Sequence, residues 1–295
     1  MTPAAPHHST RPSPAAATAA STPRRILGVV EILALAGVLS VFGFAFNLIG
    51  LLPLIAAGVT DPQPWTVADS GARLVGYLVG VGATVGIIAL YLKFRLGVHL
   101  TSLGLIRPPR WLSLVVGLVA GAAISAAGIG LAWSTGRVAP MEPAVLPGVG
   151  LLLLIGLLYL LTYLMQGAGE EIVARGLLLR GLSWWIGLPV AVAVQALFFV
   201  AIHLGNPNLT PTYAVFVLAF AVFAALLVLV QGHLWGVIGL HGGYNAMFFA
   251  GAQRGLGLRD VGDVANLNGP DIATIPLFVV GIIVLAVLLW RRRTT

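Results

Sequence analysis

The sequence predicts an all-α protein that crosses a membrane with about eight helices, and three observations lead to this prediction. Hydrophobic residues make up 59% of the 295 positions. Charged residues make up only 8%, whereas a soluble domain has about 25%. The apolar residues lie in runs of roughly 20, the length that a helix needs to cross a bilayer. A helix satisfies its own backbone hydrogen bonds, which lipid cannot do.

The chain divides into a short tail and one membrane domain. Residues 1–23 are rich in Ala, Pro, Ser and Thr, which predicts a disordered cytoplasmic tail. Residues 24–295 are expected to form the eight-helix domain. Its expected spans are 27–52, 72–92, 111–133, 148–168 with a helical extension to about 183, 187–204, 213–231, 234–251 and 274–290. Glycines such as Gly117 and Gly121 are spaced for close helix packing.

The sequence also predicts where two connecting segments lie. Residues 96–110 are too polar to span, so a short interfacial segment is expected there. Residues 252–273 form the longest outer loop, and their two arginines and three aspartates, including Asp271, nearly balance one another. This loop is therefore expected to be solvated.

The basic residues predict the orientation of the chain. Twelve Lys and Arg residues fall in loops on one side of the membrane and four on the other. The richer side is usually cytoplasmic, so both termini are expected in the cytoplasm. The Ala-, Gly- and Arg-rich composition suggests the plasma membrane of a bacterium. The basic residues do not form one face, which argues against nucleic acid as a partner, and the absence of cysteine excludes disulfides and thiolate metal sites.

The most unusual stretch is Gln166–Arg180, where two adjacent carboxylates and two arginines interrupt an apolar helix. Ionised groups at membrane depth are costly and are usually functional. Glu171 and Arg175 stand four residues apart, so they share a helix face and can form an ion pair. Glu170 has no such partner at this spacing and is the stronger candidate for chemistry.

Two later spans carry polar residues with the same four-residue spacing. Phe199 precedes His203, and His241 precedes Asn245. Glu170 lies about 16 residues before the turn near Gly187 and His203 about 16 after it. At about 1.5 Å per residue, both stand roughly 25 Å from that turn and can face each other. His241 needs a tilt or kink to reach the same depth, which the sequence leaves open.

Several kinds of chemistry fit these residues. A carboxylate beside a neutral imidazole can take a proton from water, and a second imidazole with an amide can stabilise an oxyanion. Together they would hydrolyse a peptide bond. Glu170, His203 and His241 could instead bind zinc with an open water position. A proton relay in a transporter is a further alternative, although no internal repeat supports it. The last alternative is a protein that binds a peptide without cutting it.

The three pairs, in their order along the chain, resemble the signature motifs of the CPBP intramembrane proteases. The matching residues are Glu170-Glu171-x-x-x-Arg175, Phe199-x-x-x-His203 and His241-x-x-x-Asn245. This family includes the type II CAAX prenyl endopeptidases and bacteriocin-processing or self-immunity proteins. The resemblance covers roughly residues 100–251 and implies a CAAX-protease-like bundle that acts as an intramembrane endopeptidase.

The resemblance also implies a role for each residue. Glu170 is similar to the glutamate that activates water together with His203, and His241 and Asn245 are similar to the oxyanion-stabilising pair. The supporting residues are Glu171, Arg175 and Phe199. Members are commonly labelled metalloproteases, but the glutamate–water mechanism requires no metal, so zinc stays an alternative. The implied partners are a membrane protein or peptide substrate and the lipid bilayer, and the oligomeric state is not determined.

Overall fold

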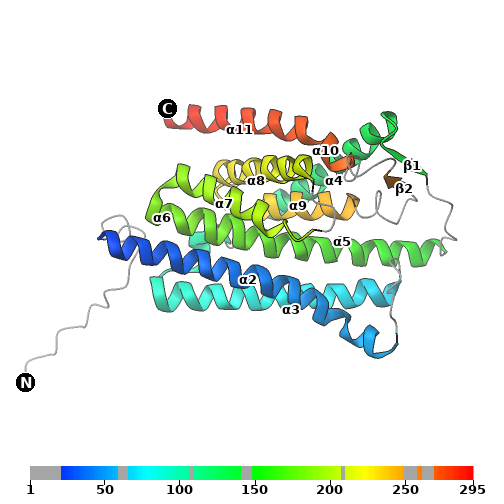
Figure 1. Ribbon diagram of the computed structural model, residues 1–295, viewed down its shortest axis with the longest axis horizontal. Helices are drawn as coiled ribbons and strands as arrows, with labels where there is room; N and C mark the ends of the chain where they lie inside the picture. The colour runs from blue at the N-terminus through cyan, green and yellow to red at the C-terminus, as the bar shows by residue number, and fades with distance from the viewer. Residues whose placement is uncertain are drawn as a thin grey trace, which may run out of the picture.

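Long apolar helices make up nearly all of the chain that the computed structural model describes. The described residues are 21–58, 66–106, 109–140, 148–206, 210–248, 258–260 and 269–294. The helices run side by side along one direction (Figure 1). The predicted all-α polytopic fold is confirmed. Most of the expected disordered tail, residues 1–20, lies outside the described residues.

Each expected span coincides with a helix. The helices are α2 (Thr22–Ala56), α3 (Val67–Tyr91), α4 (Trp111–Ser134), α5 (Val149–Glu171), α7 (Leu188–Ile202), α8 (Pro211–Gln231), α9 (Trp235–Phe248) and α11 (Ile275–Thr294). Six helical segments of the described chain are long and apolar enough to cross a membrane. Helices α7 and α9 have only 15 and 14 residues, so the count of eight spans is not confirmed.

The remaining elements are short. A π-helical turn, η1 (Leu92–Leu96), continues α3, and a 3₁₀ turn, η2 (Leu100–Leu103), lies in the segment expected at the interface. Strands β1 (Val138–Pro140) and β2 (Leu258–Asp260) pair in antiparallel register, and α10 (Gly269–Ala273) precedes α11. The expectation of a solvated loop at 252–273 is wrong for its last turn, because Asp271 is only 4% exposed.

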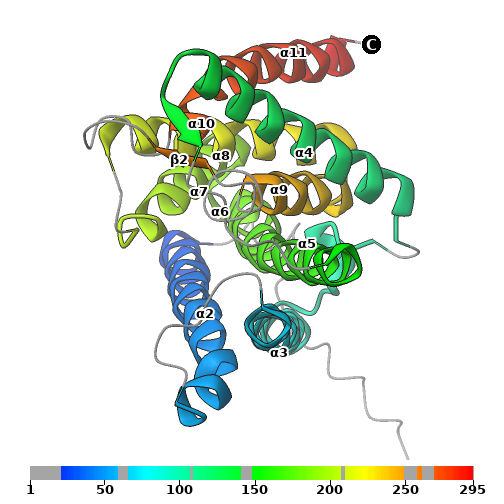
Figure 2. The same cartoon turned by 90° about the vertical axis from the view of Figure 1, so that its right-hand side faces the viewer.

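The centre of the bundle is the continuation of α5. The π-helix η3 (Ile172–Gly181) follows Glu171 directly, and α6 (Leu182–Ile186) completes the expected extension. Nine of the ten residues of η3 are buried. Helix α5 lies between the pair α2–α3 and the group formed by α4, α8 and α9 (Figure 2). π-Helical turns are rare and often occur at functional sites, which draws attention to the residues beside η3.

Glycines set the position of α9 against α4, as the spacing of Gly117 and Gly121 predicted. A Cβ atom at Gly121 would overlap the carbonyl oxygen of Leu240, and one at Gly243 would overlap that of Leu118. The two backbones therefore touch, and no larger residue fits between them. This close contact fixes where the side chains on the opposite face of α9 lie.

Candidate functional site

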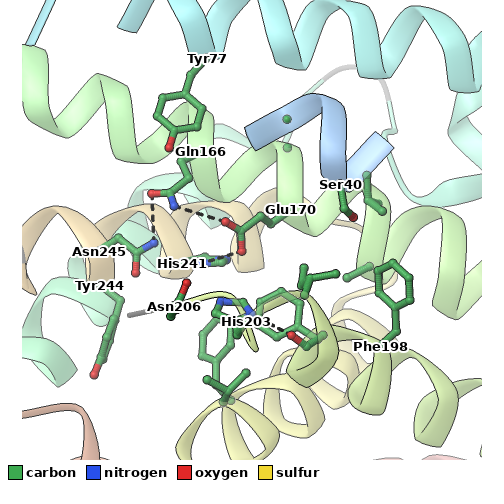
Figure 3. A pocket seen from close by; sticks show the side chains of 18 of the residues that line it. Ser40, Tyr77, Gln166, Glu170, Phe198, His203, Asn206, His241, Tyr244 and Asn245 are labelled. Atoms are coloured by element: carbon green, nitrogen blue, oxygen red, sulfur yellow. Dashed lines mark hydrogen bonds and ion pairs between the residues drawn. The ribbon is translucent and has the colours of Figure 1, made fainter. Parts of the chain in front are cut away.

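A cavity of about 350 Å³ lies where α5, η3, α7, α8 and α9 meet α2, α3 and α10. All four predicted catalytic residues line it: Glu170, His203, His241 and Asn245 (Figure 3). Phe199 lines it as well. The four polar side chains come from the end of α5, the residue after α7, and α9. His241, whose depth the sequence left open, lines the same cavity as Glu170 and His203.

The imidazole of His241 stands between the two adjacent carboxylates. Its Nδ1 lies 2.8 Å from Oε1 of Glu171. Because an ionised carboxylate can only accept, Nδ1 carries the hydrogen and donates it. Its Nε2 faces Oε2 of Glu170 at 3.8 Å, which is too long for a hydrogen bond. The Nε2 atom is therefore the one that is directed toward Glu170 and the cavity.

Behind His241, Glu171 and Arg175 form the ion pair that their spacing predicts. Nη1 of Arg175 donates to Oε1 of Glu171 over 2.8 Å, and both side chains are 0% exposed. The guanidinium also packs over the ring of Phe199 at 4.3 Å. Oε1 of Glu171 thus accepts from Arg175 and from His241 at once. The sequence indicated only a supporting role, whereas the structure shows that Glu171 also orients His241.

His203 is held by its own helix. Its Nδ1 lies 2.7 Å from the carbonyl oxygen of Phe199, and since a carbonyl only accepts, Nδ1 donates. In the neutral ring, Nε2 is then free to accept a proton. The ring of Phe199 lies 4.7 Å from that of His203 and 6.2 Å from that of His241, between centroids. Phe199 therefore packs near both imidazoles.

Glu170 differs from Glu171 in burial and in partners. Its side chain is 25% exposed, while that of Glu171 is fully buried. Oε2 of Glu170 has no hydrogen-bond partner among the described residues. The predicted pairing of Glu170 with His203 does not take the form of a direct hydrogen bond, although both line the cavity. Glu170 is consequently the carboxylate that a bound molecule could reach.

Gln166 joins two of the predicted residues and was not assigned a role from the sequence. Its Nε2 donates to Oε1 of Glu170 over 3.3 Å, and its Oε1 accepts a long hydrogen bond of 3.5 Å from Nδ2 of Asn245. The signal was present, because Gln166 lies one helical turn before Glu170. Gln166 fixes the amide and the carboxylate relative to each other.

A second carboxylate in the cavity wall was missed from the sequence. Asp271 accepts a hydrogen bond of 2.7 Å from the hydroxyl of Tyr244, and both residues are 4% exposed. Both also line the cavity. Asp271 belongs to the short helix α10, which no sequence pattern predicted, so its burial could not be foreseen. It ties α10 to α9 close to Asn245.

The three zinc candidates do not fit a metal site in this structure. In the part of the chain that the structure describes, no three His, Asp or Glu side chains are placed to hold a metal ion. We therefore derive no step through a metal.

Residues 152–247 match a family model described as type II CAAX prenyl endopeptidase Rce1-like. The matched segment contains all of the predicted catalytic and supporting residues and lies within the region that the resemblance covered. No curated protein and no solved structure matches the chain. At the level of the family, the match supports a membrane protease that acts on a peptide or protein in the membrane. Residues 152–247, about a third of the chain, are thus similar to the Rce1-like type II CAAX prenyl endopeptidases.

Proposed function

We propose that this protein is an intramembrane endopeptidase in which Glu170 and His203 activate water against a peptide bond. The observation that supports this most is the cavity of about 350 Å³, whose wall carries a reachable carboxylate, two imidazoles and an amide. These are the groups that hydrolysis requires, and they come from three separate helical segments of an otherwise apolar bundle. The substrate would be a membrane protein or peptide that enters the cavity.

Glu170 acts as the general base in this proposal. Its side chain is 25% exposed and lines the cavity, so its carboxylate can accept a proton from a water molecule there. Nε2 of His203 offers a second acceptor for the same water. The water oxygen forms the new bond to the carbonyl carbon, the bond from that carbon to nitrogen breaks, and the proton passes from Glu170 to the departing amine. General-base catalysis of this kind contributes about 10²–10⁴-fold.

His241 and Asn245 stabilise the oxyanion. Because Nδ1 of His241 donates to Glu171, the ring can donate to the oxyanion only through a proton on Nε2. That proton and Nδ2 of Asn245 are then the donors to the developing negative charge. The removal of one such donor typically costs about 10²–10³-fold in turnover. The mechanism uses no metal.

The membrane location follows from the six long apolar segments and the family. We further propose that both termini are cytoplasmic and that the membrane is the plasma membrane of a bacterium. Addition of a membrane-impermeant thiol reagent to intact cells tests the orientation, because the chain has no cysteine and a single one can be introduced at either terminus.

Proteomics of membrane peptides tests the activity and identifies the substrate in one experiment. Cells that express the wild type are compared with cells that express Glu170→Gln or His203→Gln, and new peptide termini are counted. We expect termini that occur only with the wild type. The substrate they identify is then cleaved by the purified full-length protein in a second assay.

Two exposed or half-exposed residues supply matched controls. Glu31→Gln removes a carboxylate that pairs with Arg95 far from the cavity, and His99→Gln removes an exposed imidazole. Both controls should retain the termini. Identical termini in the wild type, Glu170→Gln and His203→Gln would overturn the mechanism, and no new termini with a substrate that still binds would favour peptide binding without hydrolysis.

A further inference from the structure

Helices α4 and α9 begin side by side at the same end of the bundle. Trp111 and Trp235 are their first residues, and the centroids of these two rings are 6.0 Å apart. Further along, Gly121 of α4 packs on Leu240 of α9. Since residue numbers rise together in the two helices, they are parallel. Each helix N-terminus carries roughly half a positive charge and free N–H groups, so two such ends are concentrated at one place.

Arg110, Arg180 and His233 are basic residues of the described chain that lie beside the starts of α4 and α9, and Arg292 also reaches this end, at the carbonyl oxygen of Val230. Arg110 directly precedes α4, His233 directly precedes Leu234 and α9, and Arg180 lies near the end of η3. Burial lowers the pKa of His233 below its usual range, and the charges of Arg110 and Arg180 lower it further. The two guanidinium groups are therefore near enough to His233 to oppose its protonation.

Gly104 contacts both Arg180 and the residue before α9. The guanidinium of Arg180 packs against Gly104, where a Cβ atom would come within 3.1 Å of Nε. The carbonyl oxygen of the same glycine accepts a hydrogen bond of 3.0 Å from the amide of Leu234, the neighbour of His233. Gly104 has a φ of 91°, which few other residues would adopt. Arg180 is thus held directly beside the start of α9.

These charges have no counter-charge in the described chain. His233 is only 8% exposed, yet its Nδ1 is buried without a hydrogen-bond partner among the described residues. The same is true of Nε of Arg180. The ion pairs between described residues include neither Arg110 nor Arg180. Buried polar atoms without a partner and adjacent positive charges are both unfavourable, so a bound anion would stabilise this end of the bundle.

A phosphate group fits this end best. Guanidinium forks bind phosphate oxygens with two parallel hydrogen bonds, and helix N-termini are common phosphate sites. The position also suits a lipid, because Trp111 is 63% exposed at the end of an apolar helix, as in the aromatic belts at membrane interfaces. Basic pockets between transmembrane helices bind the head groups of anionic lipids.

We propose that Arg110, Arg180 and His233 form a binding site for a phosphate group, supplied by an anionic phospholipid or by free phosphate. The bound group joins η3 to the start of α9. These two elements carry Arg175 and His241, which share the carboxylate of Glu171. Binding is therefore expected to stabilise the bundle at the elements that support the cavity.

Thermal unfolding of the full-length protein in a neutral detergent tests this site. The Glu170→Gln background is used, so that the result does not depend on hydrolysis. Short-chain phosphatidylglycerol, short-chain phosphatidylcholine and sodium phosphate are added separately, with sodium chloride at matched ionic strength as the reference. A ligand that binds only the folded state raises the unfolding temperature. We expect phosphatidylglycerol to raise it and phosphatidylcholine not to.

Arg180→Gln and Arg110→Gln should each weaken the apparent affinity roughly tenfold, because each loses a charge-assisted hydrogen bond. Arg137→Gln, a change at an exposed residue beyond the other end of α4, is the matched control and should leave the affinity unchanged. Arg110 is exposed, so its variant should fold even if Arg180→Gln does not.

The arms of the experiment separate the two sources of phosphate. A shift with phosphatidylglycerol alone identifies a lipid, a shift with sodium phosphate alone identifies a free anion, and shifts with both show that the phosphate group itself is recognised. No shift beyond that of sodium chloride overturns the proposal. An undiminished shift in Arg110→Gln and in Arg180→Gln overturns it as well.

Discussion

His241 and Arg175 donate to the same oxygen of Glu171, each over 2.8 Å. This shared acceptor connects α9 to η3 through one fully buried carboxylate. The oxygen neutralises a buried guanidinium and at the same time fixes which nitrogen of His241 carries a hydrogen. Stability and the orientation of a candidate catalytic group are therefore coupled at a single residue.

Glu171→Gln should lower both stability and turnover. The amide leaves the fully buried Arg175 without a counter-charge, and breaking a buried pair in this way costs about 3–5 kcal/mol. It also removes the negative charge that holds the imidazole of His241. Thermal unfolding in detergent and turnover of the substrate found by proteomics measure the two effects. A loss of stability with unchanged turnover would limit Glu171 to its role with Arg175.

Glu170→Gln should lower turnover without lowering stability. Its Oε2 has no partner among the described residues, so the unfolding temperature should stay close to that of the wild type. Turnover should fall by about 10²–10⁴-fold, because the amide cannot act as a base. The same two measurements apply, with Glu31→Gln as the control. Turnover within a few-fold of the wild type would assign the base to another residue.

Gly121→Ala should disturb the site from a distance. Its new Cβ atom would overlap the carbonyl oxygen of Leu240, so α9 must move away from α4 and carry His241 and Asn245 with it. Overpacking typically costs about 1–3 kcal/mol. Gly130→Ala, in the same helix, is the control because nothing lies within 4 Å of its Cβ position. Equal unfolding temperatures of the two variants would contradict this account of the packing.

Tyr244→Phe and Asp271→Asn should each destabilise the junction of α9 with α10. The two side chains share a buried hydrogen bond of 2.7 Å, and a bond to a charged group contributes about 1.5–3 kcal/mol. A double-mutant cycle should show a coupling of similar size, since the second change removes a partner that the first has already lost. Additive effects would show that the hydrogen bond contributes little.

Removal of metal ions by a chelator tests whether the reaction proceeds without a metal, as the proposed mechanism requires. Glu170, His203 and His241 do not form a metal-binding group in the described structure. Dialysis of the purified protein against a strong zinc chelator should therefore leave turnover within about twofold of the untreated sample. Turnover that falls with chelation and returns with added zinc would require a different arrangement of these side chains.

Much of the architecture was predictable, because lipid constrains helices so strongly. A run of apolar residues in the membrane can satisfy its backbone hydrogen bonds only by forming a helix. The helices α2, α3, α4, α5, α8 and α11 could therefore be predicted from composition alone. The short helices were harder, because α7 and α9 fall below the usual spanning length. The turn of α10 and the pairing of β1 with β2 depend on contacts between distant segments, which no local pattern encodes.

The sequence by itself determined which residues could carry the chemistry. Charge in an apolar segment is conspicuous, and the four-residue spacing of Glu171 with Arg175 predicted their ion pair. Only the tertiary structure decided that Glu171 also holds His241, that Gln166 joins Glu170 to Asn245, and that Asp271 is buried against Tyr244. The physical reason is that spacing along one helix fixes which side chains share a face, whereas the partner across the interface depends on how closely two backbones approach. In this protein the glycines between α4 and α9 set that approach.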